Sequence, residues 1–69
     1  MEPAEAAVRV LREEGGSLHW TVIQDLALRR GYLDPFETPN VRRALLAALN
    51  ALARAGTVVG ESKGVYRLA

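Results

Sequence analysis

The chain has 69 residues, of which 49% are hydrophobic, and its formal net charge is +1. This length predicts one small domain over 1–69 with a single core. The absence of cysteine excludes disulfides and thiolate metal sites and favours a reducing, cytoplasmic location. No stretch approaches the roughly 20 apolar residues of a membrane span, and the acidic start does not resemble a signal peptide. We therefore expect a cytoplasmic protein, complete or excised as a domain, that does not enter a membrane.

The positive charge is concentrated in the later part of the chain. Residues 29–69 hold seven Lys or Arg side chains against three carboxylates, and eight of the nine basic residues in the whole chain are Arg. Guanidinium groups suit forked contacts with phosphate, although Arg-rich usage also fits a GC-rich genome. The scarcity of Lys and Cys beside so much Ala, Leu and Arg suggests a thermophilic source.

The first predicted element is a helix over 3–14. Pro3 suits the first helical position, and Gly15 is expected to end the helix in a left-handed conformation. A period of three to four residues predicts one apolar stripe toward the core. The stripe comprises Ala4, Ala7, Val8 and Leu11.

We expect residues 17–19 to form a short extended segment that pairs with the terminal hairpin as a third strand. A second helix is expected over 20–30, with Ile23, Leu26 and Ala27 facing inward. The loop over 31–37 carries three large apolar side chains, so we expect it to pack back onto the core. These side chains are Tyr32, Leu33 and Phe36.

The third predicted helix covers 39–54, with Thr38 as the N-cap and Pro39 at its first position. One face is apolar and is formed by Val41, Ala44, Leu45, Ala48, Leu49 and Leu52. The opposite face is formed by Asn40, Arg43, Leu46, Ala47, Asn50 and Arg54. Two short β-prone runs follow, over 57–59 and 65–68, and a glycine-containing segment joins them.

The order helix, strand, helix, helix, strand, strand predicts a winged helix-turn-helix. This is an α+β fold, mainly helical, with a small antiparallel sheet. The predicted core is Val8, Leu11, Leu18, Ile23, Leu26, Val41, Leu45, Leu49, Leu52, Val58 and Leu68.

The sequence gives little support for catalysis. His19 is the only histidine, and we expect it to be structural, forming a hydrogen bond near the start of the second helix. No second histidine, cysteine or carboxylate pair at metal spacing accompanies it. Ser17 and Ser62 have no base nearby in sequence. We therefore expect no enzyme activity, no metal, no cofactor and no small-molecule substrate.

Double-stranded DNA is the expected partner. A recognition helix needs short polar or basic side chains near its N-terminus that reach base edges. Asn40 and Arg43 meet this requirement, since Asn reads adenine and Arg reads guanine through paired hydrogen bonds. Ala47 suits contact with a thymine methyl group, and Asn50 lies on the same face two turns further on.

Three other cations are predicted to meet phosphate. Arg42 lies at the edge of the apolar stripe, and Lys63 lies at the tip of the predicted wing, where glycines let the backbone approach closely. Arg30 lies in the last turn of the second helix, where its alternative role is to complement the helix dipole.

An alternative function is protein–protein interaction, as a homodimer or a docking module. Leu46 makes the middle of the supposed reading face apolar, and an exposed Leu beside Ala47 and Asn50 suits a partner surface. If the loop over 31–37 covers Leu46 instead, that surface disappears.

Several short motifs run through nearly the whole chain. They are Ala6-Ala7-Val8, Val10-Leu11, Gly16-Ser17-Leu18-His19-Trp20 followed by Ile23, Thr38-Pro39, Val41-Arg42-Arg43-Ala44-Leu45, and Gly64-Val65-Tyr66-Arg67-Leu68. Together they resemble the HARE-HTH domain, a winged helix-turn-helix related to the N-terminal domain of the bacterial RNA polymerase delta subunit. The resemblance implies an accessory DNA-binding module, for instance in transcription regulation, without catalytic residues. The Ala-rich second half of the third helix and Leu46 depart from the family pattern.

Overall fold

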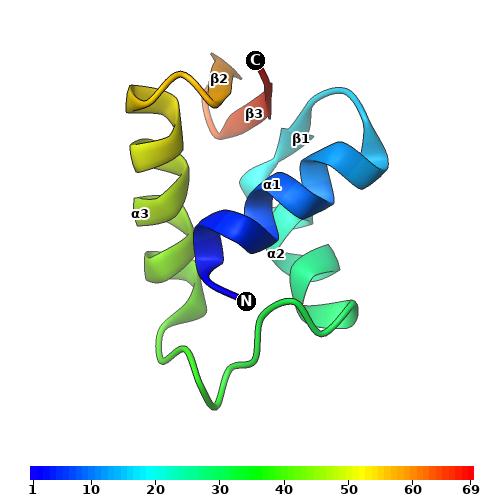
Figure 1. The fold of residues 1–69 in the computed structure, drawn as a ribbon, viewed down its shortest axis with the longest axis vertical. Coiled ribbons are helices and arrows are strands. Elements are labelled where there is room, and N and C mark those ends of the chain that lie inside the picture. The colour runs from blue at the N-terminus through cyan, green and yellow to red at the C-terminus, as the bar shows by residue number, and fades with distance from the viewer.

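The computed structural model describes residues 1–69 and contains three helices and three strands. The elements are α1 (Pro3–Glu14), β1 (Leu18–His19), α2 (Trp20–Arg29), α3 (Val41–Arg54), β2 (Val58–Ser62) and β3 (Val65–Leu68). The helices pack around one core, and the sheet lies beside the C-terminal end of α3 (Figure 1). This order confirms the predicted α+β winged helix.

The sheet has the strand order β1-β3-β2, and both pairings are antiparallel. Strand β1 pairs with β3 through Leu18 opposite Tyr66 and His19 opposite Val65, which confirms the predicted third strand. The Trp20 amide donates to the Gly64 carbonyl at 2.8 Å. This bond continues the contact between the two chain segments to the beginning of α2.

Helix α1 has the predicted bounds, but the predicted inward stripe is wrong in part. Ala7 and Leu11 are buried as expected, whereas Ala4 and Val8 are only half-buried. The buried face also includes Ala6 and Val10. The cause is that α1 contacts both α2 and α3, so its inner surface is a band wider than one stripe and rotated from the predicted one.

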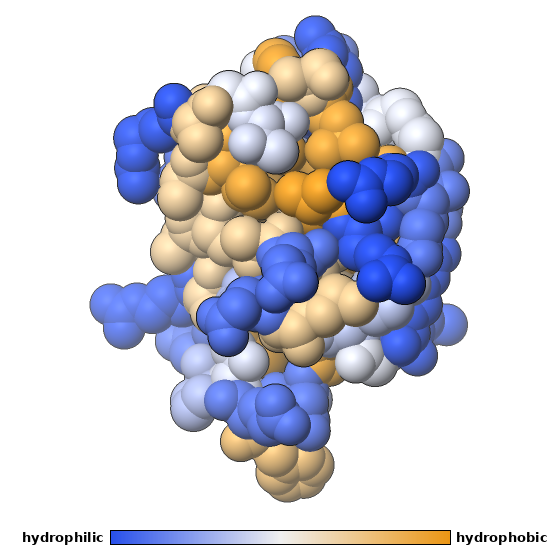
Figure 2. Space-filling model, viewed as in Figure 1, coloured by the Kyte–Doolittle hydropathy of each residue, from blue (hydrophilic) through white to orange (hydrophobic).

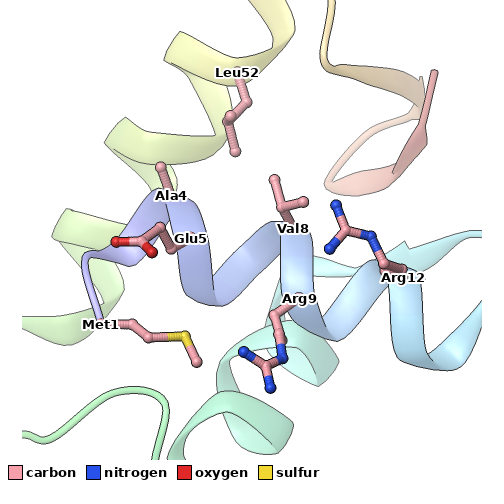
Figure 3. A pocket seen from close by; sticks show the side chains of 7 residues that line it. All are labelled: Met1, Ala4, Glu5, Val8, Arg9, Arg12 and Leu52. Carbon is pink, nitrogen blue, oxygen red and sulfur yellow. The ribbon is translucent and has the colours of Figure 1, made fainter.

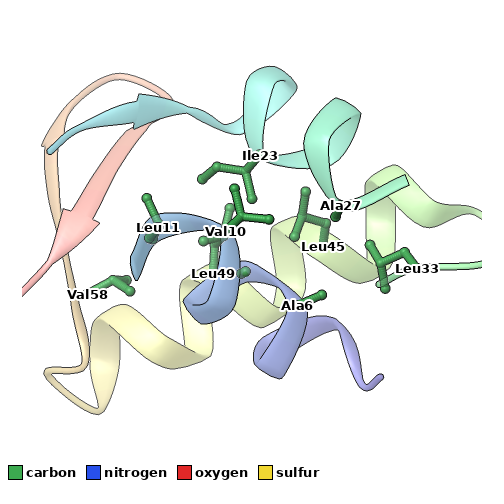
Figure 4. Packing of buried hydrophobic residues seen from close by; sticks show 10 residues of the cluster. Ala6, Val10, Leu11, Ile23, Ala27, Leu33, Leu45, Leu49 and Val58 are labelled. Carbon is green, nitrogen blue, oxygen red and sulfur yellow. The ribbon is translucent and has the colours of Figure 1, made fainter. Parts of the chain in front are cut away.

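The core contains ten buried side chains, all of them apolar (Figure 4). Five of the predicted core residues belong to it, namely Leu11, Ile23, Leu45, Leu49 and Val58. The other six are half-buried, namely Val8, Leu18, Leu26, Val41, Leu52 and Leu68, and all of them except Val8 pack against this core. Small residues of α1 and α2 take their place at the centre because they let the helices approach closely.

The loop between α2 and α3 divides into a packed part and an exposed part. The Tyr32 and Leu33 amides donate to the Ala27 carbonyl at 2.8 and 3.2 Å, and Leu33 is buried. Phe36 is 95% exposed, so the expectation that it packs onto the core is wrong. The Asp34 carboxylate accepts the Phe36 amide at 2.9 Å, in a tight turn that holds this segment away from the helices.

Helix α3 begins at Val41, so the prediction of Thr38 as N-cap and Pro39 as first helical residue is wrong. The N-cap is Asn40, which has a left-handed conformation with φ of 53°. Its side-chain oxygen accepts the Arg43 amide at 3.2 Å. Thr38 is drawn into the preceding turn, where its amide donates to the Asp34 carbonyl at 2.9 Å.

None of the three helices combines the length and the apolar character that crossing a membrane requires.

Candidate nucleic-acid interface

Helix α3 presents an outer face of short and basic side chains. Arg43, Ala47, Asn50 and Arg54 are all exposed, and Arg42 is exposed at the side of this face. The helix contains no Asp or Glu. Its outer surface therefore carries positive charge that no acidic residue of the same helix neutralises.

Asn40 occupies the start of this face but has a structural role as well. Its side-chain oxygen accepts the Arg43 amide as the helix cap. An Asn that reads adenine uses both its oxygen and its amide nitrogen. In this conformation the amide nitrogen is the group left to donate outward.

The ion pairs of the chain separate its cations into two groups. Four arginines are paired with carboxylates, namely Arg9, Arg29, Arg30 and Arg67. The five cations outside these pairs are Arg12, Arg42, Arg43, Arg54 and Lys63. Four of these five lie on α3 or at the hairpin tip, so the free positive charge is concentrated there.

Arg30, which the sequence places among the phosphate ligands, is engaged within the protein. Its guanidinium donates to Glu13 at 2.8 Å and to Glu14 at 2.5 Å. The Tyr32 hydroxyl donates to the same Glu13 carboxylate at 2.6 Å. The hydrogen bond from Tyr32, together with Arg30, lowers the pKa of Glu13 below its ordinary 4.5. Arg30 thus ties the end of α2 to the end of α1.

The hairpin neutralises its own carboxylate. Glu61 accepts hydrogen bonds from the Ser17 hydroxyl and, at 2.8 Å, from Arg67. Both interactions, the one with Ser17 first, lower the pKa of Glu61 below its ordinary value. Lys63, in the turn between β2 and β3, is left as the one uncompensated charge of the hairpin.

His19 joins the hairpin to the start of α2. Its Nδ1 atom accepts the Thr21 amide at 3.2 Å, as the N-cap of α2. This confirms the structural hydrogen bond predicted for His19 and leaves Nε2 as the ring nitrogen that faces away from Thr21. A Cβ atom added to Gly64 would lie 2.8 Å from that Nε2 atom. The close fit fixes the turn that carries Lys63.

Leu46 is half-buried, so the expectation of an exposed Leu in the middle of the α3 face is wrong. Ala47 and Asn50 remain exposed beside it. The apolar area available to the protein-docking alternative at this face is correspondingly small.

Sequence reasoning missed the pairing of Arg30 and the neutralisation of Glu61. The contacts of Arg30 with Glu13 and Glu14, and of Ser17 with Glu61, join residues that are distant in sequence. A signal for the first was present, since Glu13-Glu14 and Arg29-Arg30 are adjacent pairs of opposite charge at two helix ends that each precede a glycine.

Comparisons with protein-family models, with curated proteins and with solved structures found no match to this chain. No cluster of three or more His, Cys, Asp or Glu side chains that could hold a metal ion occurs in it. What the chain does is therefore inferred from its own fold and side chains.

Proposed function

We propose that this chain binds double-stranded DNA, with α3 in the major groove and the β2–β3 hairpin over the phosphate backbone. The observation that carries the proposal is the charge of α3. Arg42, Arg43 and Arg54 are exposed, have no carboxylate partner, and share a helix with no acidic residue. DNA binding releases counterions from phosphates, and each free cation adds to that release.

The dimensions of α3 suit the groove. A helix of 14 residues is about 21 Å long, and the major groove of B-DNA accepts a helix. Ala47 and Ala51 are exposed and short, so the helix axis can approach the base pairs. In this placement Arg43 and Asn50 face base edges, Ala47 faces a methyl group, and Arg42 and Arg54 face phosphates.

The hairpin supplies the second contact. Lys63 is its uncompensated charge, because Glu61 is held by Ser17 and Arg67. The turn is anchored to α2 through Gly64 and Trp20, so Lys63 meets the backbone from a fixed position. Arg30 contributes no free charge to the surface, since Glu13 and Glu14 compensate it.

We further propose that the chain is a HARE-HTH type module with an accessory or transcription-regulatory role. The motifs Leu18-His19-Trp20 and Gly64-Val65-Tyr66-Arg67-Leu68 support this assignment. They form the two sides of the contact between β1, the start of α2 and the hairpin. These residues maintain the fold, so the assignment concerns the class of module and not the DNA sequence that it reads.

Fluorescence anisotropy with a labelled duplex tests the proposal. Arg43→Ala should cost about 1–3 kcal/mol of binding free energy if the side chain reads a base. Arg29→Ala is the matched control, because it removes the same charge from α2 at a residue paired with Asp25. If the two variants bind DNA equally well, α3 is not the reading helix.

The alternative, protein docking through Leu46, Ala47 and Asn50, is less well supported because Leu46 is half-buried. Leu46→Glu separates the two. It should abolish self-association or docking if that face is a protein interface. If DNA is the partner, the variant should only weaken DNA binding through its added charge.

A further inference from the structure

A stripe along the outside of α1 has an acid at one end, an apolar centre and a base at the other end. Glu5, Val8 and Arg12 are spaced three and four residues apart, which places them on one side of the helix. Neither Glu5 nor Arg12 takes part in an ion pair of the chain. The stripe thus carries two opposite charges that form no ion pair within the same molecule.

This stripe borders a shallow apolar groove of about 370 Å³ between α1 and α3 (Figure 3). Met1, Ala4 and Val8 line it from the N-terminal segment, and Leu52 lines it from α3. Met1 is 48% exposed. Figure 2 shows apolar surface in the middle of this face with hydrophilic side chains beside it. The groove is therefore an apolar strip with charged borders, the composition of a docking surface.

We propose that a second copy of this chain docks on this face, with the two α1 helices antiparallel across a two-fold axis next to Val8. Residues 5 and 12 are equally far from the midpoint between residues 8 and 9. A two-fold axis at that midpoint therefore brings Glu5 of each copy to Arg12 of the other. An isologous contact uses the same patch twice, and this patch is complementary to itself. A parallel arrangement would place like charges together.

The spacing gives the contact two charge pairs around one apolar centre. Glu5 and Arg12 are seven residues apart, about 10.5 Å along the axis. Val8 lies between them and meets its own copy near the two-fold axis. Arg9 is held by Glu13 of its own helix and lies over the Tyr32 ring at 5.3 Å. Its carbon stem can cover the apolar centre while its charge stays occupied.

The helix dipole gives another reason for these charges, since an acid in the first turn and a base in the last turn are both favourable. The dipole does not require the apolar groove between them. The dipole and the dimer also lead to different expectations when the two charges are exchanged. Glu5→Arg with Arg12→Glu is unfavourable twice over for the dipole, but it restores both pairs across the two-fold axis.

The outer face of α3 takes no part in this contact. The only residue that α3 contributes to the groove is Leu52, which lies on the opposite, apolar face of the helix. A dimer of this kind leaves Arg43, Ala47 and Arg54 of both copies free. The dimer is thus independent of the DNA proposal.

Sedimentation equilibrium of the full chain without DNA tests the dimer. The wild type should show a monomer–dimer equilibrium. Glu5→Arg and Arg12→Glu should each raise the dissociation constant about tenfold or more, because each variant places like charges together twice. The double variant Glu5→Arg/Arg12→Glu should return to the wild-type constant. Arg54→Glu is the control and should leave dimerisation unchanged.

Three results would overturn the inference. They are a wild type that stays monomeric up to about 1 mM, single variants that dimerise like the wild type, or a folded double variant that does not recover. Circular dichroism verifies the fold of each variant. A monomeric protein that binds DNA would refute the dimer alone, whereas a dimer that ignores duplexes would refute the DNA proposal alone.

Discussion

Gly64→Ala should destabilise the protein more than the same substitution in an open turn, because Gly64 is both left-handed and enclosed. Its φ is +77°, and an added Cβ atom would lie 2.8 Å from His19 Nε2 and 3.2 Å from Trp20 Cδ1. The His19 ring cannot move aside freely, since its Nδ1 atom accepts the Thr21 amide. A methyl group therefore has to displace the cap of α2 or the hairpin.

Gly31 provides the matched comparison for the magnitude. Its φ is +74°, and nothing lies within 4 Å of an added Cβ atom, so Gly31→Ala pays only the backbone strain of about 1–2 kcal/mol. Gly64→Ala should lose the same amount of unfolding free energy through strain and about 1–3 kcal/mol more through overpacking. The difference in unfolding free energy between the two variants is thus expected to be about 1–3 kcal/mol, and each kcal/mol lowers Tm by about 4–8 °C in a domain of this size.

Thermal and urea denaturation followed by circular dichroism measure this difference. In a His19→Ala background, Gly64→Ala should exceed Gly31→Ala by less than in the native background, since only the Trp20 contact at 3.2 Å remains. Equal losses for Gly31→Ala and Gly64→Ala in the native background would refute the close fit between the hairpin and α2. So would an overpacking term that the removal of His19 leaves undiminished.

Three further predictions concern other parts of the chain. Asn40→Ala should lower the unfolding free energy by about 2–3 kcal/mol in urea denaturation, because it removes the cap of α3 and puts Ala in a left-handed conformation. Asn40→Gly, which keeps the conformation, should lose only a few tenths. The hydrogen bond from Tyr32 lowers the pKa of Glu13. As pH falls, Glu13 is therefore protonated in the unfolded chain before it is protonated in the folded one. Its contribution to the free energy of unfolding is complete above the ordinary pKa of 4.5 and is lost as pH falls through the lower pKa of the folded state. Tyr32→Phe should flatten that acid limb in melts recorded down to about pH 3. Phe36→Ser should change the unfolding free energy by less than about 0.5 kcal/mol, whereas Leu33→Ala in the same loop should cost about 2–5 kcal/mol in the same measurement.

The order of the elements could be predicted because its signals are local. Pro3 and Gly15 bound α1 by their own backbone preferences, and the β-prone run at 65–68 marks a strand without reference to the rest of the fold. The start of α3 could not be found in this way. Thr38-Pro39 is a valid start signal. In the structure, however, the Thr38 amide donates a hydrogen bond to the Asp34 carbonyl in the preceding turn, and the helix begins after Asn40.

The sequence predicts which residues lie at the candidate site, but it does not predict which of the cations are paired with carboxylates. The exposed face of α3 follows from its period, so Arg43, Ala47 and Asn50 are placed where the sequence puts them. For Arg30, whether the cation is free depends on carboxylates far away in the chain. Arg30 is compensated from α1, 16 and 17 residues earlier. The paired charges at the two helix ends suggest this contact only once the two ends are known to lie together. The inner face of α1 was misjudged for a similar reason, since two helices and not one determine it.

Binding of the wild-type chain to a duplex across a salt series tests the central claim most directly. If Arg42, Arg54 and Lys63 each neutralise a phosphate, log K should fall with log salt with a slope of about −2.7, which is 0.9 for each contact. Lys63→Ala should reduce the steepness of that slope by about 1 while leaving Tm unchanged. Absence of binding at low salt, or an affinity that does not respond to salt, would contradict the assignment of α3 and the hairpin as a DNA-binding surface.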